Sequence, residues 1–121
     1  MSVTEVGGTP WELPGHIAEL LDMGGGEVVQ EILALFLQDV PGRVKRLATA
    51  IESGDAVMVS REGHSLKGGC GQVGAKRLAA LAAEWEYGPA DPARWRTLLA
   101  EFYAEFARVE SMVRQHPTFT G

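Results

Sequence analysis

The chain has 121 residues, of which 45% are hydrophobic, and its formal net charge is −5. This length fits one domain that can bury a core without disulfides or metal. The acidic balance argues against a protein that coats nucleic acid, and no apolar run approaches the roughly 20 residues of a membrane span. A single cysteine, Cys70, excludes an internal disulfide, and the polar N-terminus lacks a signal pattern. These features predict a cytoplasmic protein.

Apolar residues recur at helical spacing along the chain, and strand-like alternation is absent. Residues 1–9 are expected to be a flexible lead-in, followed by a short helix over 14–23 that ends in three glycines. A long helix is predicted from about residue 27 to 53, because Gly54 and Asp55 suit a helix end and the start of the next helix. Its predicted buried stripe is Val28, Ile32, Leu35, Phe36, Val40, Val44, Leu47 and Ile51.

The third helix is predicted to start near Ala56 and to break at Gly74, and a fourth follows over 75–87. Asp91 and Pro92 suit the start of a last helix that runs to about residue 115. The pattern predicts an all-α fold, an antiparallel four-helix bundle with a short additional N-terminal helix. We expect the bundle to cover residues 10–116 and a tail to cover 117–121. The buried face of the third helix is predicted to be Val59, Gly63, Leu66, Cys70 and Val73.

His64 lies in the middle of this third helix. At about 100° per residue, it points about 140° away from the centre of the buried face. We therefore expect its imidazole outside the bundle, with Lys67 one turn onward and toward the flank. Gly63 faces inward, where it permits close helix approach. The other helical neighbours of His64 are Ser60, Arg61, Gly68 and Gly71, and the two glycines leave the space beside the ring empty.

An exposed imidazole beside an ammonium suits phosphoryl chemistry. A neutral imidazole is a nucleophile that can attack phosphorus and hold a phosphoryl group on nitrogen. A cation three residues away can neutralise the phosphoryl oxygens during and after transfer. Arg61 would extend the positive field and attract an acidic partner site. The plain alternative is a solvated surface histidine.

Other chemistry is weakly indicated. His16, His64 and His116 are far apart in the sequence, no zinc spacing is present, and Cys70 falls on the buried face. Glu86 is interpreted first as a helix-surface charge, with contact to the imidazole from the neighbouring helix as the alternative. Trp11 is expected either to be exposed to a partner or to pack the lead-in against the bundle.

The run "HSLKGGCGQVGA" at residues 64–75 resembles the signature of histidine-containing phosphotransfer (HPt) domains. It is also similar to the N-terminal phosphotransfer domain of chemotaxis-type kinases. Supporting features extend over roughly residues 14–115. Gly63 departs from the alanine that is common before the histidine of such domains.

The resemblance implies a phosphorelay carrier in which His64 accepts a phosphoryl group from a receiver-domain aspartate and passes it to another. Lys67 would stabilise the phosphoryl oxygens, Gly68 would admit the receiver, and Gln72 would support the site. The partners implied are receiver domains of response regulators or hybrid histidine kinases, and they would supply Mg²⁺ and the acidic cluster. The domain itself would need no cofactor or metal and would be a phosphotransfer intermediate, not an enzyme with its own nucleotide site.

We expect a monomer whose docking surface combines the His64 face with an apolar stripe of the short first helix. Two alternatives stay open. One is an interaction module that binds a kinase or receiver without carrying phosphate, and the other is the excised phosphotransfer domain of a chemotaxis-like kinase. The expected docking stripe consists of Ile17, Leu20 and Leu21.

Overall fold

The computed structural model describes residues 11–120, and these residues form helices and turns without a strand. This confirms the predicted all-α class with a short helix ahead of the bundle. The expected lead-in over residues 1–9 lies outside the described residues. The elements are α1 (Gly15–Asp22), α2 (Gly26–Ser53), α3 (Ala56–Gln72), α4 (Lys76–Tyr87), α5 (Pro92–Arg114) and α6 (Pro117–Thr120).

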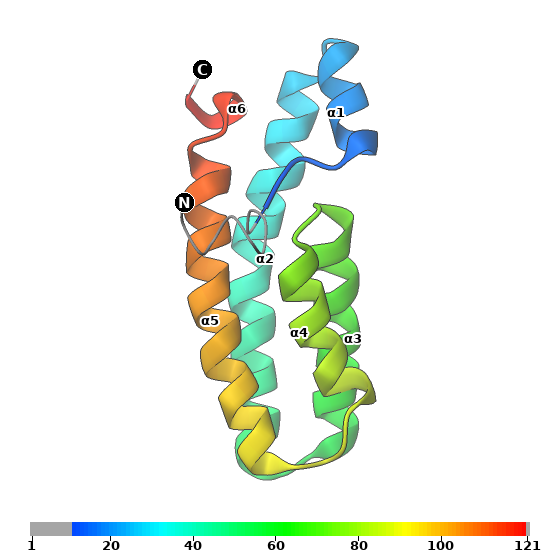
Figure 1. Ribbon diagram of the computed structural model, residues 1–121, viewed down its shortest axis with the longest axis vertical. Coiled ribbons are helices and arrows are strands. Elements are labelled where there is room, and N and C mark those ends of the chain that lie inside the picture. Colours follow the sequence, from blue (N-terminus) through cyan, green and yellow to red (C-terminus); the bar gives the residue numbers. More distant parts are fainter. Residues whose placement is uncertain (1–10, 121) are drawn as a thin grey trace, which may run out of the picture.

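Four of these helices, α2 to α5, run antiparallel as a bundle (Figure 1). The helices α2 and α5 extend beyond the shorter α3–α4 hairpin, and α1 packs on α2 near the end that this hairpin leaves uncovered. The last helix, α6, was not predicted. It contacts α2 and α5, and Phe119 packs against the core, so the packed structure continues past residue 116.

The turns form where the sequence indicates. Gly54 has φ +69° and Gly74 has φ +83°, and both are left-handed values that favour glycine. Gly54 ends α2, and Gly74 lies in the turn between α3 and α4. The Asp55 carboxylate accepts a hydrogen bond from the Met58 amide at 3.1 Å and caps α3. Asp91 caps α5 in the same way, with Pro92 in the first turn. Each of the helices α1 to α5 therefore begins within a residue or two of its predicted position.

The buried face of α2 differs from the predicted stripe. Val28 is 50% exposed and Leu35 is 64% exposed, whereas Val29, Leu33 and Leu37 are buried. The reason is that α2 contacts α1, α3, α5 and α6 along its length. Its buried face is consequently broad, and a single apolar stripe cannot describe it.

Trp11 is buried in the core, so the alternative that exposes its side chain to a partner is wrong. Its indole N–H donates to the Val73 carbonyl at 2.7 Å, so that the segment before α1 is fixed to the α3–α4 turn. None of the helices within residues 11–120 combines the length and the apolar character that crossing a membrane requires.

Candidate functional site

The helix α3 carries His64 on its outer face. Its inward residues are Val59, Gly63, Leu66 and Cys70, as the helical spacing predicts. The His64 side chain is 68% exposed. The predicted outward direction of the imidazole is therefore confirmed.

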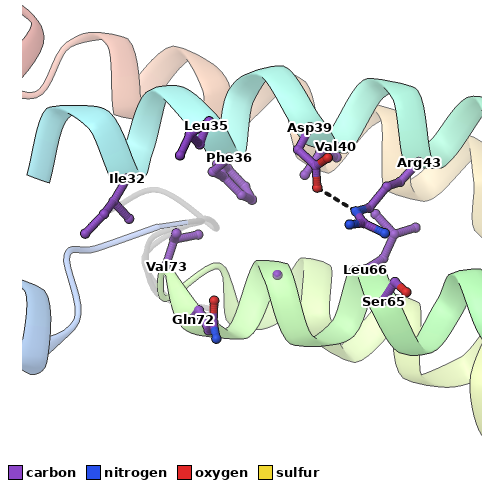
Figure 2. A pocket seen from close by; sticks show the side chains of 11 residues that line it. Ile32, Leu35, Phe36, Asp39, Val40, Arg43, Ser65, Leu66, Gln72 and Val73 are labelled. Atoms are coloured by element: carbon purple, nitrogen blue, oxygen red, sulfur yellow. Dashed lines mark hydrogen bonds and ion pairs between the residues drawn. The ribbon is translucent and has the colours of Figure 1, made fainter. Parts of the chain in front are cut away.

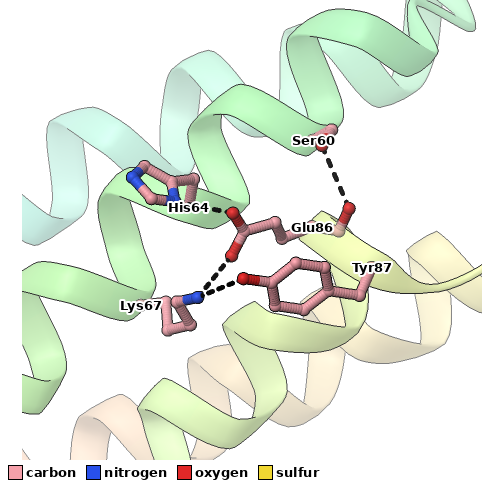
Figure 3. A network of polar contacts seen from close by, with 5 residues as sticks. All are labelled: Ser60, His64, Lys67, Glu86 and Tyr87. Carbon is pink, nitrogen blue, oxygen red and sulfur yellow. Dashed lines mark hydrogen bonds and ion pairs between the residues drawn. The ribbon is translucent and has the colours of Figure 1, made fainter.

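The imidazole is anchored by a carboxylate of α4. Nδ1 of His64 lies 2.6 Å from Oε2 of Glu86, whose side chain is only 13% exposed (Figure 3). The other carboxylate oxygen, Oε1, lies 2.7 Å from Nζ of Lys67. Glu86 thus bridges the imidazole and the ammonium. Glu86 is interpreted from the sequence first as a surface charge, with contact to the imidazole as the alternative. The structure shows the alternative.

Tyr87 completes the network and was not predicted. Nζ of Lys67 donates to the Tyr87 hydroxyl at 2.8 Å and lies 4.5 Å from the centroid of its ring. The only sequence signal for this residue was its place at the end of α4, one position after Glu86.

Two contacts of the α3–α4 backbone position Glu86. A Cβ atom on Gly63 would lie 2.8 Å from Cβ of Trp85 and 2.9 Å from the backbone nitrogen of Glu86, so only glycine permits this approach of the helices. One turn earlier, the Ser60 hydroxyl donates to the Glu86 carbonyl at 3.0 Å. Ser60, which was predicted to shape the site beside His64, thus holds the end of α4.

The electrostatics of the network favour its charged forms. Hydrogen bonding to Lys67 is the largest effect that lowers the pKa of Glu86, and the bond to His64 acts in the same direction. The bonds to Glu86 and Tyr87 raise the pKa of Lys67. The site therefore holds a carboxylate and an ammonium together across the neutral pH range.

The helix surface beside the imidazole is bare. Gly68 and Gly71 are exposed, and a Cβ atom added at either residue would meet nothing within 4 Å. Alanine at an exposed helical position is more stable than glycine by about 0.5–1 kcal/mol. Glycine at residues 68 and 71 therefore makes α3 less stable than alanine would, and it leaves open space beside His64.

Arg61 and Gln72 are less closely connected to the site. Both side chains are exposed. Within the described part of the chain, neither has a hydrogen bond or ion pair with His64, Lys67 or Glu86. Gln72 lies two turns beyond His64, at one end of a groove.

This groove runs between α2 and α3, on the side of α3 that faces away from α4 (Figure 2). Its volume is about 440 Å³. Ser65 and Gly69 bring it next to the bare surface beside His64, and the exposed Leu35 forms part of its apolar wall. The lining residues are Ile32, Leu35, Phe36, Asp39, Val40, Arg43, Ser65, Leu66, Gly69, Gln72 and Val73.

The expected docking stripe on α1 needs correction. Ile17 is 2% exposed and belongs to the core, while Leu20 and Leu21 are partly buried against it. The apolar face of this short amphipathic helix packs on α2, so Ile17 has no surface to offer a partner.

Residues 31–113 match the Hpt domain family, a stretch that contains His64, Lys67 and Glu86. The chain belongs to the Hpt domain family. The Hpt domain here is 33% identical over 74 residues to Histidine-containing phosphotransfer protein 2 of Arabidopsis thaliana, an alignment that covers 59% of this chain and 47% of that protein. The chain thus spans about half the length of that curated relative.

The crystal structure of histidine-containing phosphotransfer protein B from Pseudomonas aeruginosa PAO1 resembles this Hpt domain with a TM-score of 0.75 at 28% sequence identity. The similarity covers 85% of this chain and 91% of that one. The helical architecture of the Hpt domain is therefore shared along nearly the whole of both chains.

Proposed function

We propose that this Hpt domain carries a phosphoryl group on Nε2 of His64 and exchanges it with an aspartate of a receiver domain in a phosphorelay. One observation carries the proposal. Glu86 holds Nδ1 at 2.6 Å on an imidazole that is 68% exposed, so one ring nitrogen is anchored and the opposite edge of the ring faces solvent.

The anchoring selects the nucleophile. The Glu86 carboxylate can only accept a hydrogen bond, so Nδ1 carries the proton and the lone pair of the neutral ring lies on Nε2. Nε2 attacks the phosphorus of the aspartyl phosphate. The N–P bond forms as the O–P bond breaks, and the aspartate leaves as a carboxylate. The ring becomes a cation, which Glu86 stabilises, and the reverse reaction passes the group to another aspartate.

Lys67 and the bare helix surface support this transfer. The ammonium of Lys67 neutralises the phosphoryl oxygens as the group moves between two nucleophiles. Gly68 and Gly71 leave room for the receiver active site to approach the ring. Arg61, exposed one turn before His64, adds positive charge to the face that meets an acidic partner site. Mg²⁺ and the acidic cluster are the receiver's contribution.

The groove between α2 and α3 is the docking surface of this proposal, in place of the α1 stripe. It is continuous with the bare surface beside His64 through Ser65 and Gly69. Leu35, 64% exposed, gives it an apolar contact that a transient interface of modest size would cover. Gln72 contributes to the groove and does not support the imidazole directly.

The test is transfer from phosphorylated receiver domains. We expect the Hpt domain to take up acid-labile, base-stable phosphate and His64→Gln to take up none, with unchanged helical content by circular dichroism. The matched control is His16→Gln, which removes an exposed histidine of α1 and is expected to transfer like the wild type. If His64→Gln retains both receiver binding and signalling, the domain is an interaction module and the proposal is wrong.

A further inference from the structure

Lys67 is held from two directions by consecutive residues of α4. Its Nζ atom lies 2.7 Å from Oε1 of Glu86 and 2.8 Å from the hydroxyl of Tyr87. The same atom lies 4.5 Å from the centre of the Tyr87 ring, within the range of a cation–π contact. Figure 3 shows the hydroxyl and the carboxylate converging on the ammonium.

Tyr87 is 72% exposed and lies at the last residue of α4, so burial does not explain its position. Both its hydroxyl and its ring contact the Lys67 ammonium. A lysine ammonium sits on a flexible four-carbon stem and is strongly hydrated, so a single surface ion pair fixes it poorly. A hydroxyl and a ring face together restrict where the ammonium can be.

The chemistry of the hydroxyl suits a phosphoryl site. A second carboxylate would also hold the lysine, but its charge would repel the phosphoryl oxygens. The tyrosine hydroxyl is neutral and adds no such charge. An ammonium has three N–H donors. The Tyr87 hydroxyl accepts from one of them, and Glu86 forms an ion pair with the ammonium at 2.7 Å, so that a donor is left for a phosphoryl oxygen.

We propose that Tyr87 is a positioning residue for phosphoryl transfer, which holds the Lys67 ammonium beside the His64 imidazole ready to meet the phosphoryl oxygens. This inference rests on the proposed function of His64. Tyr87 acts only through Lys67 and touches neither the imidazole nor the phosphoryl group.

Phosphoramidate is the probe, because it phosphorylates histidine without a protein partner and so separates the chemistry from docking. Nε2 of His64 attacks the phosphorus, the P–N bond of phosphoramidate breaks, and ammonia leaves and takes a proton from water. The imidazole keeps its Nδ1 proton and becomes a phosphorylated cation. Incorporation is followed by the intact mass of the protein.

The experiment is a double-mutant cycle of Tyr87→Phe and Lys67→Ala. Because Tyr87→Phe removes one solvent-exposed hydrogen bond while the Glu86 ion pair still holds the ammonium, we expect about fivefold slower phosphorylation of His64. In the Lys67→Ala background, the same substitution is expected to change nothing further. Tyr103→Phe, which alters an exposed tyrosine of α5, is the matched control and should react like the wild type.

A second measurement follows the titration of Lys67 by NMR of its side-chain carbon Cε. Tyr87→Phe should move this titration to lower pH, because the lost hydrogen bond contributes to the raised pKa of Lys67. A tyrosine with a merely structural role would leave the titration where it is.

The outcomes separate the two proposals. If the wild type and His64→Gln incorporate equal phosphate, His64 is not the acceptor and the proposed function fails together with the inference. If His64 is phosphorylated but Tyr87→Phe reacts at the wild-type rate, only the inference is overturned. A Tyr87→Phe effect that persists in Lys67→Ala overturns it as well, because Tyr87 would then act independently of the lysine.

Discussion

Gly63 of α3 lies directly against Glu86 of α4, since a Cβ atom at residue 63 would be 2.9 Å from the Glu86 backbone nitrogen. The side chain of Glu86 continues from that point to Nδ1 of His64, the residue after the glycine. Atoms of α4 fill the space that a side chain at residue 63 would need. The absence of that side chain therefore allows Glu86 to come close enough to hydrogen-bond His64.

Gly63→Ala is therefore expected to destabilise the protein. The gain in helix propensity is about 1 kcal/mol, and overpacking against a backbone costs about 1–3 kcal/mol, so we expect a net loss of up to about 2 kcal/mol in unfolding free energy. The separation of the helices should also weaken the His64–Glu86 bond. Urea denaturation measures the first effect and the nitrogen shifts of the imidazole measure the second. Gly69→Ala, at a residue with open space around its Cβ position, is the matched control and should stabilise.

Gly68→Ala is expected to raise stability and lower function. Open space surrounds this position, so alanine should add about 0.5–1 kcal/mol to the unfolding free energy and raise Tm by about 2–5 °C. Its methyl group, however, enters the surface that a receiver must approach. Transfer from a phosphorylated receiver should slow, while phosphorylation by phosphoramidate should be little changed. Unimpaired transfer from the receiver would show that the bare surface is not needed for access.

Leu35→Asp tests the groove as the docking surface. Leu35 is 64% exposed, so the substitution should change stability by no more than about 0.5 kcal/mol. Receiver affinity, measured by titration calorimetry, should fall about tenfold because a charge replaces an apolar contact. Val57→Asp places the same charge at a residue of α3 that is 63% exposed and outside the groove, and it should bind like the wild type. Equal losses in both variants would argue against docking in the groove.

The Glu86 network predicts a dependence of stability on acid. The pKa of Glu86 is lowered in the folded state, so its contribution to stability is fully present above the ordinary value of 4.5 and is lost as the pH falls through the lowered pKa. The stability difference between wild type and Glu86→Gln should therefore be largest near neutral pH and shrink toward zero in acid. Urea denaturation at a series of pH values measures it. The control is Glu52→Gln, at an exposed carboxylate of α2 that has no ion pair within the described residues. A difference independent of pH would contradict the assignment.

Cys70 should be unreactive in the native protein. Burial raises the pKa of its thiol from 9.0 to about 12. A shift of this size lowers the thiolate fraction about a thousandfold at pH 8, and only the thiolate is alkylated. Iodoacetamide labelling should accordingly be at least about a thousandfold slower in the native protein than in protein unfolded by guanidinium chloride. Rapid native labelling would show that α3 opens at this residue.

The sequence predicts those features that depend on neighbours along the chain. The positions of the helices follow from Gly54, Asp55, Gly74 and Asp91, because turn and cap residues act locally. The outward direction of His64 follows from the helical period alone. For the same reason, the open space beside the imidazole could be predicted from Gly68.

The features that the sequence did not predict depend on the packing of separate helices. The distance from His64 to Glu86 depends on how closely α3 and α4 approach, and the contact of Lys67 with Tyr87 depends on where α4 ends. Leu35 and Ile17 have similar apolar character, yet one is exposed and the other is buried. Ile17 is buried because α1 packs on α2, whereas no helix within residues 11–120 covers Leu35 on α2. The apolar period of a single helix does not show which of its residues another helix will cover.

The hydrogen bond from Trp11 to the Val73 carbonyl makes the segment before α1 part of the folded domain. The carbonyl of Glu12 and the ring of Pro14 also lie against Gly74, within 3.0 Å of where a Cβ atom would be. A chain shortened to the family match would start at residue 31 and keep every group of the phosphoryl site. It would nevertheless lack Trp11, Glu12 and Pro14, which cover the α3–α4 turn. Fraying of the uncovered turn would then spread along α3 toward His64.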